Sequence, residues 1–529
     1  MIRTIEASNR IDGMDLNLSL RRAARDFGNH CATIYNGRKR SWRDTHLRVE
    51  HLAGALEKLG VGKGDRVAGL AFNSDNYLEL FYAVWRIGAV MVPLNSRWSV
   101  AENTYALNDS GAKILFSSEE YKAIEEQLLS QTDVSTIVRI GDSDGSCMCT
   151  EGLIHASESP NHVDVGAGDL AAIFYTGGTT GFPKGVMLSH GGLIVSALSF
   201  APVMKADQES RYLHGPPFFH MAAGTAIVMM TMFAATHIIL DRFDEKSALS
   251  ALAEHRATHG LFVPSMVQMF IAELKQNPVD VSSLKTMIYG ASPMPEATIR
   301  AALQAFPDTE FVQAYGQTEL SPFATALRHS DHILEGPLSN RLRSAGRTIP
   351  NCEIKITDEN GTPLPTGEIG EICVRGPNVM LGYWNKPKET ADTIVGGWCR
   401  TGDAGYFDED RYLYIADRVK DMIISGGENV YSAEVENAVM SYPDVIECAV
   451  IGIPSEEWGE SVHAIVHVSD GSEITFEKLY VHCKSLIAGY KCPKSFEVHD
   501  GPLPLTPIGK ISKKALRAPF WEGRKRNVN

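Results

Sequence analysis

The chain has 529 residues, which is too long for one hydrophobic core and predicts a protein of more than one domain. Apolar residues make up 44% and charged residues 22%, which are ordinary values for a soluble globular enzyme. The 50 Lys and Arg residues against 64 Asp and Glu residues give a formal net charge of −14, which disfavours a nucleic-acid-binding role.

The N-terminal residues MIRTIEASNR contain no apolar h-region, so we expect no secretory signal. No stretch reaches about 18 uninterrupted apolar residues, so we expect no transmembrane segment either. The nine cysteines are scattered and form no C-x-x-C pair, a pattern that fits reduced thiols in a cytoplasm. The sequence therefore predicts a cytoplasmic protein.

Helical and strand-like segments alternate through the first 345 residues. Apolar residues recur at helical spacing in 45–59, 77–89 and 266–276, and Ser99 with Glu102 has the spacing of a capping box before another helix. Strand-like runs occupy 90–94, 113–118, 171–175, 286–293 and 310–319. This alternation is typical of a wound, largely parallel α/β sheet.

The pattern changes after about residue 345. Residues 349–376 alternate apolar and polar side chains around two turn clusters, which predicts antiparallel β-structure, and 408–424 indicates another hairpin. A compact α+β segment begins at about 430. We therefore expect the α/β class: a large N-terminal domain of wound α/β sheets plus a β-rich subdomain over 1–417, and a small α+β domain over 418–529.

A glycine- and threonine-rich loop, TGGTTGFPKG (176–185), directly follows the strand-like run AAIFY. Glycines let the backbone approach a polyphosphate closely, and successive N–H groups can form an anion nest. The spacing matches neither a Walker A loop nor a Rossmann fingerprint. A flexible surface loop is the alternative, but the loop's hydroxyls and its lysine favour phosphate binding. The polar side chains are those of Thr176, Thr179, Thr180 and Lys184.

The loop closely resembles the phosphate-loop signature of the AMP-forming adenylating enzymes, the ANL superfamily of acyl-CoA synthetases, nonribosomal-peptide adenylation domains and beetle luciferases. Gly177 is a departure, because Ser is frequent there; a side-chain donor is lost while a backbone N–H remains. Further motifs of that family follow in order, so the resemblance runs from about residue 30 to about 518. It implies an ATP-phosphate site at Thr176, Gly177, Gly178, Thr179, Thr180, Gly181 and Lys184.

Three motifs resemble the acyl, adenine and metal sites of that family. PPFFH (216–220) would place His220 beside the acyl pocket and the α-phosphate, although a structural histidine is the alternative. In YGASP (289–293) the backbone of Gly290, Ala291 and Ser292 would line the adenine pocket. In YGQTE (315–319), Tyr315 and Gly316 would contact adenine and Thr318 the α-phosphate. Glu319 would bind Mg²⁺ that carries phosphate, with Thr180 as a second ligand.

Three further motifs resemble the ribose, hinge and lysine motifs. In GWCRTGDAGY (397–406), Asp403 would accept hydrogen bonds from both ribose hydroxyls. In the segment 416–436, Arg418 would contact ribose or phosphate, and Lys420 would be the hinge. Ser425, Gly426 and Gly427 would line the pantetheine tunnel. In PLTPIGKISKKALR (504–517), Lys510 would be the catalytic lysine, although a solvated basic face that includes Lys513 and Lys514 is the alternative.

The resemblance implies an AMP-forming acyl-CoA synthetase that uses ATP, Mg²⁺ and coenzyme A. Its small domain would be mobile and would rotate about Lys420 between two half-reactions. Two alternatives stay open. The chain can load a carrier protein instead of CoA, or it can be a catalytically silent adenylate-binding scaffold. A homodimer is a further expectation from the resemblance.

The sequence says less about the acid. The candidate pocket stretches 221–224, 262–265, 290–292 and 312–314 are mostly small and apolar, and none offers Asp or Glu to an α-amino group. An apolar tunnel suits a medium- or long-chain fatty acid, which we prefer, and it also suits an aryl acid of the cinnamate type.

Overall fold

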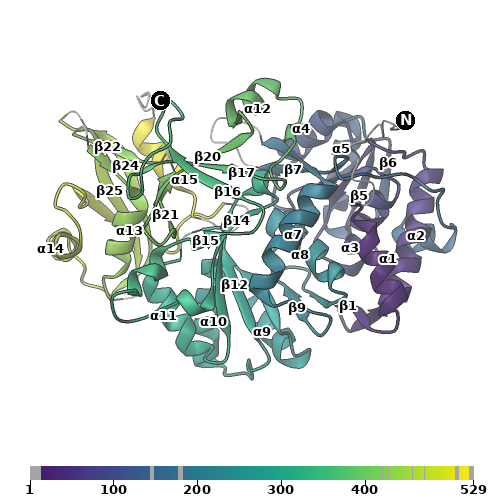
Figure 1. Cartoon of the computed structure of the whole chain (residues 1–529), viewed down its shortest axis with the longest axis horizontal. Coiled ribbons are helices and arrows are strands. Elements are labelled where there is room, and N and C mark those ends of the chain that lie inside the picture. The colour runs from purple at the N-terminus through teal and green to yellow at the C-terminus, as the bar shows by residue number, and fades with distance from the viewer. Residues whose placement is uncertain are drawn as a thin grey trace, which may run out of the picture.

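The computed structural model describes residues 14–142, 148–176, 183–292, 294–418, 421–426, 428–455, 457–469, 471–506 and 511–522. Within these residues, four β-sheets with helices packed on them form a mixed α/β structure (Figure 1). The expected fold class is confirmed: wound α/β sheets and a β-rich part precede a smaller α+β lobe. None of the described helices combines the length and apolar character needed to cross a membrane.

The first sheet has seven strands in the order β18-β8-β7-β4-β3-β5-β6. Its central strands are parallel, whereas β7 and β8 are antiparallel and flank the glycine- and threonine-rich segment in the sequence. The bounds are β3 Arg66–Leu70, β4 Val90–Pro93, β5 Ile114–Ser117, β6 Thr136–Arg139, β7 Leu170–Thr176, β8 Lys184–Ser189 and β18 Gly382–Tyr383.

The second sheet has nine strands in the order β15-β14-β13-β12-β11-β9-β10-β1-β2. Its six central strands, β13 to β1 in that order, are parallel, and the strands at both edges are antiparallel. The bounds are β1 Cys31–Tyr35, β2 Arg38–Ser41, β9 Arg211–His214, β10 Thr236–Ile239, β11 His259–Phe262, β12 Thr286–Gly290, β13 Glu310–Gly316, β14 Phe323–Leu327 and β15 Arg347–Thr348.

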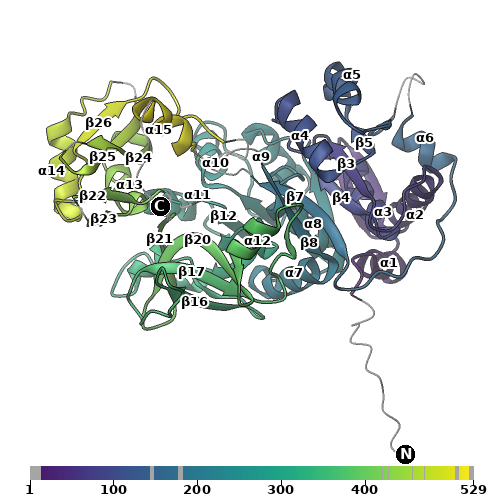
Figure 2. The same ribbon diagram turned by 90° about the horizontal axis from the view of Figure 1, so that it is seen from above.

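The third and fourth sheets are mainly antiparallel. The third contains β16 Glu353–Thr357, β17 Gly370–Arg375, β19 Ile394–Val395, β20 Trp398–Phe407 and β21 Leu413–Arg418. The fourth contains β22 Ile423–Ser425, β23 Glu428–Val430, β24 Val445–Ser455, β25 Gly459–Val468 and β26 Ser495–Val498. The hairpin expected over 408–424 is wrong in its second half, because β21 pairs with β20 whereas β22 starts the fourth sheet. Figure 2 shows the fourth sheet and its helices as a lobe beside the third sheet.

The helices begin where the sequence provides caps. Ser99 and Glu102 form the expected capping box before α4. The helix bounds are α1 Asn17–Asp26, α2 Trp42–Lys58, α3 Asp75–Arg86, α4 Val100–Ser110, α5 Lys122–Gln131, α6 Thr150–His155, α7 His190–Met204, α8 Met221–Met232, α9 Glu245–Glu254, α10 Pro264–Gln276, α11 Glu296–Ala305, α12 Pro387–Thr393, α13 Ser432–Met440, α14 Phe476–Leu486 and α15 Lys513–Trp521.

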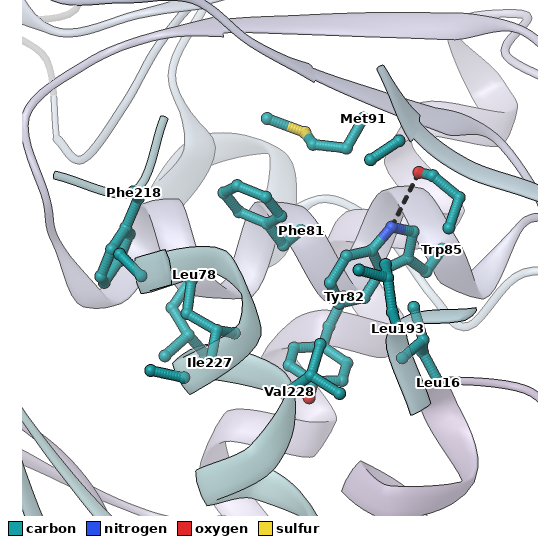
Figure 3. Close-up of a cluster of buried hydrophobic side chains, with 14 of the residues drawn as sticks. Leu16, Leu78, Phe81, Tyr82, Trp85, Met91, Leu193, Phe218, Ile227 and Val228 are labelled. Carbon is teal, nitrogen blue, oxygen red and sulfur yellow. Dashed lines mark hydrogen bonds between the residues drawn. The ribbon is translucent and has the colours of Figure 1, made fainter. Parts of the chain in front are cut away.

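One large hydrophobic core joins the first two sheets. Aromatic residues of α3, among them Phe81 and Trp85, pack with Leu193 of α7 and Val228 of α8 (Figure 3). The indole N–H of Trp85 donates to the carbonyl of Ala171 on β7 at 2.9 Å, so the buried indole keeps a hydrogen-bond partner. Because residues of both sheets belong to this core, the strands that carry the candidate site are held in one rigid frame.

Candidate active site

Motifs that lie far apart in the sequence meet at one edge of the second sheet. Strands β11, β12 and β13 are parallel neighbours, with Phe262 opposite Tyr289 and Gly290 opposite Ala314. The stretches that follow these strands therefore emerge at the same, C-terminal edge of the sheet. In open α/β sheets this edge is where ligands bind. The segments that follow residues 262, 290 and 314, which the sequence predicts to line the acyl and adenine pockets, therefore lie near one another.

Both carboxylate oxygens of Asp403 are engaged from two different segments. The Tyr315 hydroxyl donates to Oδ2 at 2.9 Å, and Nε of Arg418 lies 2.9 Å from Oδ1. The antiparallel pairing of β20 with β21 places Asp403 opposite Arg418. Asp403 is buried, whereas 54% of the Arg418 side chain is exposed, so the guanidinium is open to a ligand. The structure thus gathers three of the expected nucleotide-binding residues into one network.

A second network surrounds Glu319, which lies in the 3₁₀ turn Thr318–Leu320 after β13. The Tyr383 hydroxyl donates to Oε1 of Glu319 at 2.9 Å. Glu319 is buried, and this burial raises the pKa of its carboxyl group. Tyr383 lies in the GYWN segment, which the motif comparison passed over. Its sequence signal is modest, a tyrosine directly after Gly382; its place on a short strand paired with β8 is seen only in the structure.

Lys184 reaches the second network from the hairpin that carries the glycine- and threonine-rich loop. Its Nζ lies 4.9 Å from the centre of the Tyr383 ring, within cation–π range. Thr176 pairs with Lys184 across the hairpin, so the two described ends of the loop lie side by side. Among the described residues, no carboxylate forms an ion pair with Lys184. The ammonium group therefore remains available to an anionic ligand.

Glycines at the sheet edge allow very close backbone packing. A Cβ atom at Gly316 would lie 1.9 Å from the carbonyl oxygen of Pro322, and one at Gly290 would lie 2.2 Å from that of Ala314. Ala291, which follows Gly290, has a φ of 66°, a left-handed conformation that is unusual for alanine. A larger side chain at Gly290 or Gly316 would push the neighbouring backbone away, so close packing of the chain requires glycine at both positions.

His220 has a structural function that can be seen directly. It is the N-cap residue of α8, and its Nδ1 accepts a hydrogen bond from the backbone N–H of Ala222 at 3.3 Å. This matches the alternative of a structural histidine, and its role beside an acyl group stays a prediction. Thr318 begins the 3₁₀ turn that contains Glu319, and Ser292 lies in the turn after β12.

In the C-terminal lobe, Ser425 ends β22 and Gly426 follows with a φ of 62°. The N–H of Gly426 donates to the carbonyl of Trp458 at 2.9 Å, and a Cβ atom at Gly426 would meet the indole ring at 2.6 Å. Trp458 is 44% exposed. The motif comparison did not find this residue; its signal is a tryptophan within a charged loop.

Several predicted site residues lie outside the described residues, and their roles stay predictions. They are Gly177, Gly178, Thr179, Thr180, Gly181, Lys420, Gly427 and Lys510.

The chemistry of Glu319 fits a magnesium ion that is carried by phosphate. The carboxylate is buried, and in the part of the chain that the structure describes no Lys or Arg pairs with it. A hard oxygen ligand of this kind suits Mg²⁺, which usually takes one or two carboxylates together with phosphates and water. No group of three or more His, Cys, Asp and Glu side chains suited to a metal occurs among the described residues. Substrate phosphates and water would therefore complete the coordination.

The two networks and the available lysine supply the kinds of group that a nucleotide carrying a metal ion would need: acceptor oxygens, a buried carboxylate and two cations. Residues 20–384 match the family of AMP-binding enzymes, and residues 434–510 match the AMP-binding enzyme C-terminal domain. The chain therefore belongs to the AMP-binding enzymes, as the sequence resemblance predicts.

Relatives of known activity cover nearly the whole chain. A feruloyl-CoA synthase of an Amycolatopsis species is 38% identical over 94% of this chain and 98% of its own. The long-chain-fatty-acid–CoA ligase FadD13 of Mycobacterium tuberculosis is 36% identical over 90% of this chain and 93% of its own. The structure of o-succinylbenzoate CoA synthetase (MenE) from Bacillus subtilis in complex with its acyl-adenylate intermediate superposes with a TM-score of 0.82. That protein is 28% identical, and the match covers 94% of this chain and 97% of that one.

Proposed function

We propose that this chain is an AMP-forming acyl-CoA ligase. In the first half-reaction a carboxylate oxygen of the acid attacks the α-phosphorus of ATP, the bond to the bridging oxygen breaks, and pyrophosphate leaves. In the second, the thiol of coenzyme A attacks the carbonyl carbon of the acyl-adenylate, and AMP leaves. The observation that carries this proposal is the convergence of the Asp403 and Glu319 networks on the segment Tyr315–Glu319.

The roles of the residues follow from these contacts. Asp403, with Tyr315 and Arg418 on its two oxygens, would bind the ribose diol and fix the nucleotide. Lys184 and the adjoining loop would bind the outer phosphates. Bound Mg²⁺ on Glu319 would neutralise charge on the phosphates, which lowers the repulsion between two anionic reactants. Catalysis would rest on positioning and electrostatics, since no side-chain nucleophile is required.

For the acid, we propose a medium- or long-chain fatty acid. The stretches expected to line the pocket contain buried apolar residues, among them Phe262, Val263 and Val312. The FadD13 relative is named as a ligase of long-chain fatty acids. The second candidate is an aryl acid, which the similarity to a feruloyl-CoA synthase favours.

We also propose the division into domains 1–417 and 418–529, with rotation about Lys420 between the half-reactions. Its support is that β21, the last strand of the third sheet, ends at Arg418, and that the fourth sheet starts at Ile423. Lys510 would serve the first half-reaction alone. We further propose a cytoplasmic location, which the free thiols of the eight described cysteines support, and a homodimer, which rests on the resemblance alone.

Pyrophosphate exchange and thioester formation test the proposal together. Exchange of labelled pyrophosphate into ATP is measured with octanoate, palmitate, ferulate and 4-coumarate, and acyl-CoA is then assayed by mass spectrometry. We expect exchange and CoA ester with at least one fatty acid. Exchange without CoA ester would favour carrier loading, and absence of exchange with every acid would favour a silent scaffold. Lys510→Ala should abolish exchange but still convert supplied acyl-AMP to acyl-CoA; equal loss of both steps would contradict the two-orientation proposal.

A further inference from the structure

Asp109, which lies in none of the motifs, contacts both flanks of the phosphate-loop hairpin. It occupies the last turn of α4. One carboxylate oxygen, Oδ2, accepts a hydrogen bond from the Tyr175 hydroxyl at 2.7 Å. Tyr175 directly precedes Thr176 on β7, at the described start of the loop.

The backbone carbonyl of Asp109 holds the other flank. It accepts a hydrogen bond from the indole N–H of Trp384 at 2.8 Å and a second from the side-chain amide of Asn385 at 3.1 Å. The backbone N–H of Trp384 donates in turn to the carbonyl of Gly185 at 2.8 Å. Gly185 is the partner of Tyr175 across the hairpin. The two strands that lead into and out of the loop are therefore both fastened to one residue.

The carboxylate of Asp109 would be in an unfavourable position without a hydrogen-bond donor such as the Tyr175 hydroxyl. The C-terminal end of a helix carries partial negative charge, so an aspartate in the last turn of α4 is disfavoured by the helix dipole. Among the described residues, no Lys or Arg forms an ion pair with Asp109. Its side chain accepts the hydrogen bond from Tyr175, and hydrogen bonds to a charged group are stronger than neutral ones.

Arg66 also holds the end of α4. Nε of Arg66 donates to the carbonyl of Ser110 at 2.6 Å, and its guanidinium lies 5.4 Å from the Trp384 ring centre. Trp384 follows Tyr383, the residue that holds Glu319 and faces Lys184. The contacts of Asp109 thus extend to Trp384, the direct neighbour of the residue that contacts both Glu319 and Lys184.

We propose that Asp109 is a positioning residue for phosphate binding, acting through Tyr175 and Trp384 on the two described ends of the loop hairpin. This inference rests on the proposed function. Asp109 should therefore affect the binding of ATP and of pyrophosphate. It should not affect the binding of the acid, because its contacts reach the hairpin and not the stretches after β11 and β12.

Steady-state kinetics of four variants test the inference. We expect Asp109→Ala and Tyr175→Phe each to raise KM for ATP and for pyrophosphate about tenfold, with KM for the acid changed less than twofold. The double variant should be no worse than either single one, because both remove the same hydrogen bond. Asp109→Asn, whose amide oxygen can still accept from Tyr175, should remain within about threefold of wild type.

Asn108→Ala is the matched control, since Asn108 is its exposed neighbour on α4 and donates to the carbonyl of Gln131. It should leave every KM unchanged. The proposal is overturned if Asp109→Ala raises the KM of the acid as much as that of ATP. It is also overturned if Asp109→Ala lowers only the unfolding temperature, or if the two single effects add. Should the wild-type protein exchange pyrophosphate with no acid, the proposed function fails by itself, and ATP affinity by calorimetry on the same variants still decides the role of Asp109.

Discussion

The carboxylate of Asp417 accepts a hydrogen bond from the backbone N–H of Ser432, the first residue of α13. Asp417 is the neighbour of Arg418 on β21, and consecutive strand residues point to opposite faces. One face of this strand therefore contributes Arg418 to the Asp403 network, and the other caps the first helix of the C-terminal lobe. The strand links the candidate active site mechanically to that lobe.

Replacing Asp417 should loosen the start of α13. The N-cap residue Tyr431 makes no side-chain capping bond, so Asp417 supplies the cap from outside the helix. Loss of a cap costs about 0.5–2 kcal/mol. We expect Asp417→Ala to speed amide hydrogen exchange over 432–440, whereas Asp417→Asn should retain much of the protection because its amide oxygen still accepts. Asp410→Asn, at an exposed turn, is the control. Unchanged exchange in Asp417→Ala would show that the cap is dispensable.

Asp403→Asn should weaken nucleotide binding more than chemistry. The substitution keeps the shape of the side chain but replaces one of the two acceptor oxygens that face Tyr315 and Arg418. Since ribose contacts exist in both the ground state and the transition state, we expect KM for ATP to rise at least tenfold, with kcat within about threefold of wild type. The measurement is pyrophosphate exchange at varied ATP. An equal rise in KM for the acid would point to general disruption of the sheet edge.

Tyr383→Phe should impair the use of Mg²⁺. It removes the hydroxyl that donates to Oε1 of Glu319 while the ring beneath Lys184 remains. The freed, buried carboxylate loses its orientation, so we expect exchange to fall roughly ten- to a hundredfold and half-maximal activity to need more Mg²⁺. Tyr442→Phe, in the C-terminal lobe, is the matched control. A rate loss that is the same at every Mg²⁺ concentration would argue against a metal role for Glu319.

The free energy of unfolding should decrease at low pH, because His332 is buried and stays neutral in the folded state. The Tyr289 hydroxyl lies 2.9 Å from Nε2 of His332, whose Nδ1 lies 2.9 Å from the carbonyl of Arg328. Burial lowers the pKa of His332 to about 4. The unfolded chain, with a His pKa near 6.5, binds more protons between pH 6.5 and 4, so stability declines as pH falls through this window.

For His332 alone, the loss between pH 6.5 and 4 amounts to roughly 3 kcal/mol. His332→Asn should therefore be less stable at pH 7.5 but lose less of its unfolding temperature on going to pH 5 than the wild-type protein. Scanning calorimetry at the two pH values measures both. His155→Asn, at an exposed helix end, should keep the wild-type pH dependence. Parallel pH curves for His332→Asn and wild type would exclude His332 as a source of the acid sensitivity.

Local patterns predicted most of the elements correctly. Helical periodicity and the Ser99 capping box identified α2, α3 and α4, and short apolar runs identified β4, β5 and β7, because these signals depend on neighbours within a few residues. The second half of the hairpin expected over 408–424 is wrong for the converse reason, whereas β21 does pair with β20 across residues 408–412. Residues 421–426 come only a few positions after β21 in the sequence. Nevertheless β22 pairs with β23 and β25, which belong to another sheet. Strand pairing is a choice among distant partners that local pattern does not encode.

The sequence by itself determined the family, the fold class and the identity of the candidate nucleotide ligands, because motif spacing preserves the chemistry that ATP requires. The tertiary structure decided which side chains meet. It paired Asp403 with Tyr315 and Arg418, gave Glu319 its partner Tyr383, and connected Asp109 to Tyr175 across 66 positions of the chain. These contacts depend on the order of strands in the sheets and on packing between sheets. Both arise from burial of surfaces that lie far apart in the sequence.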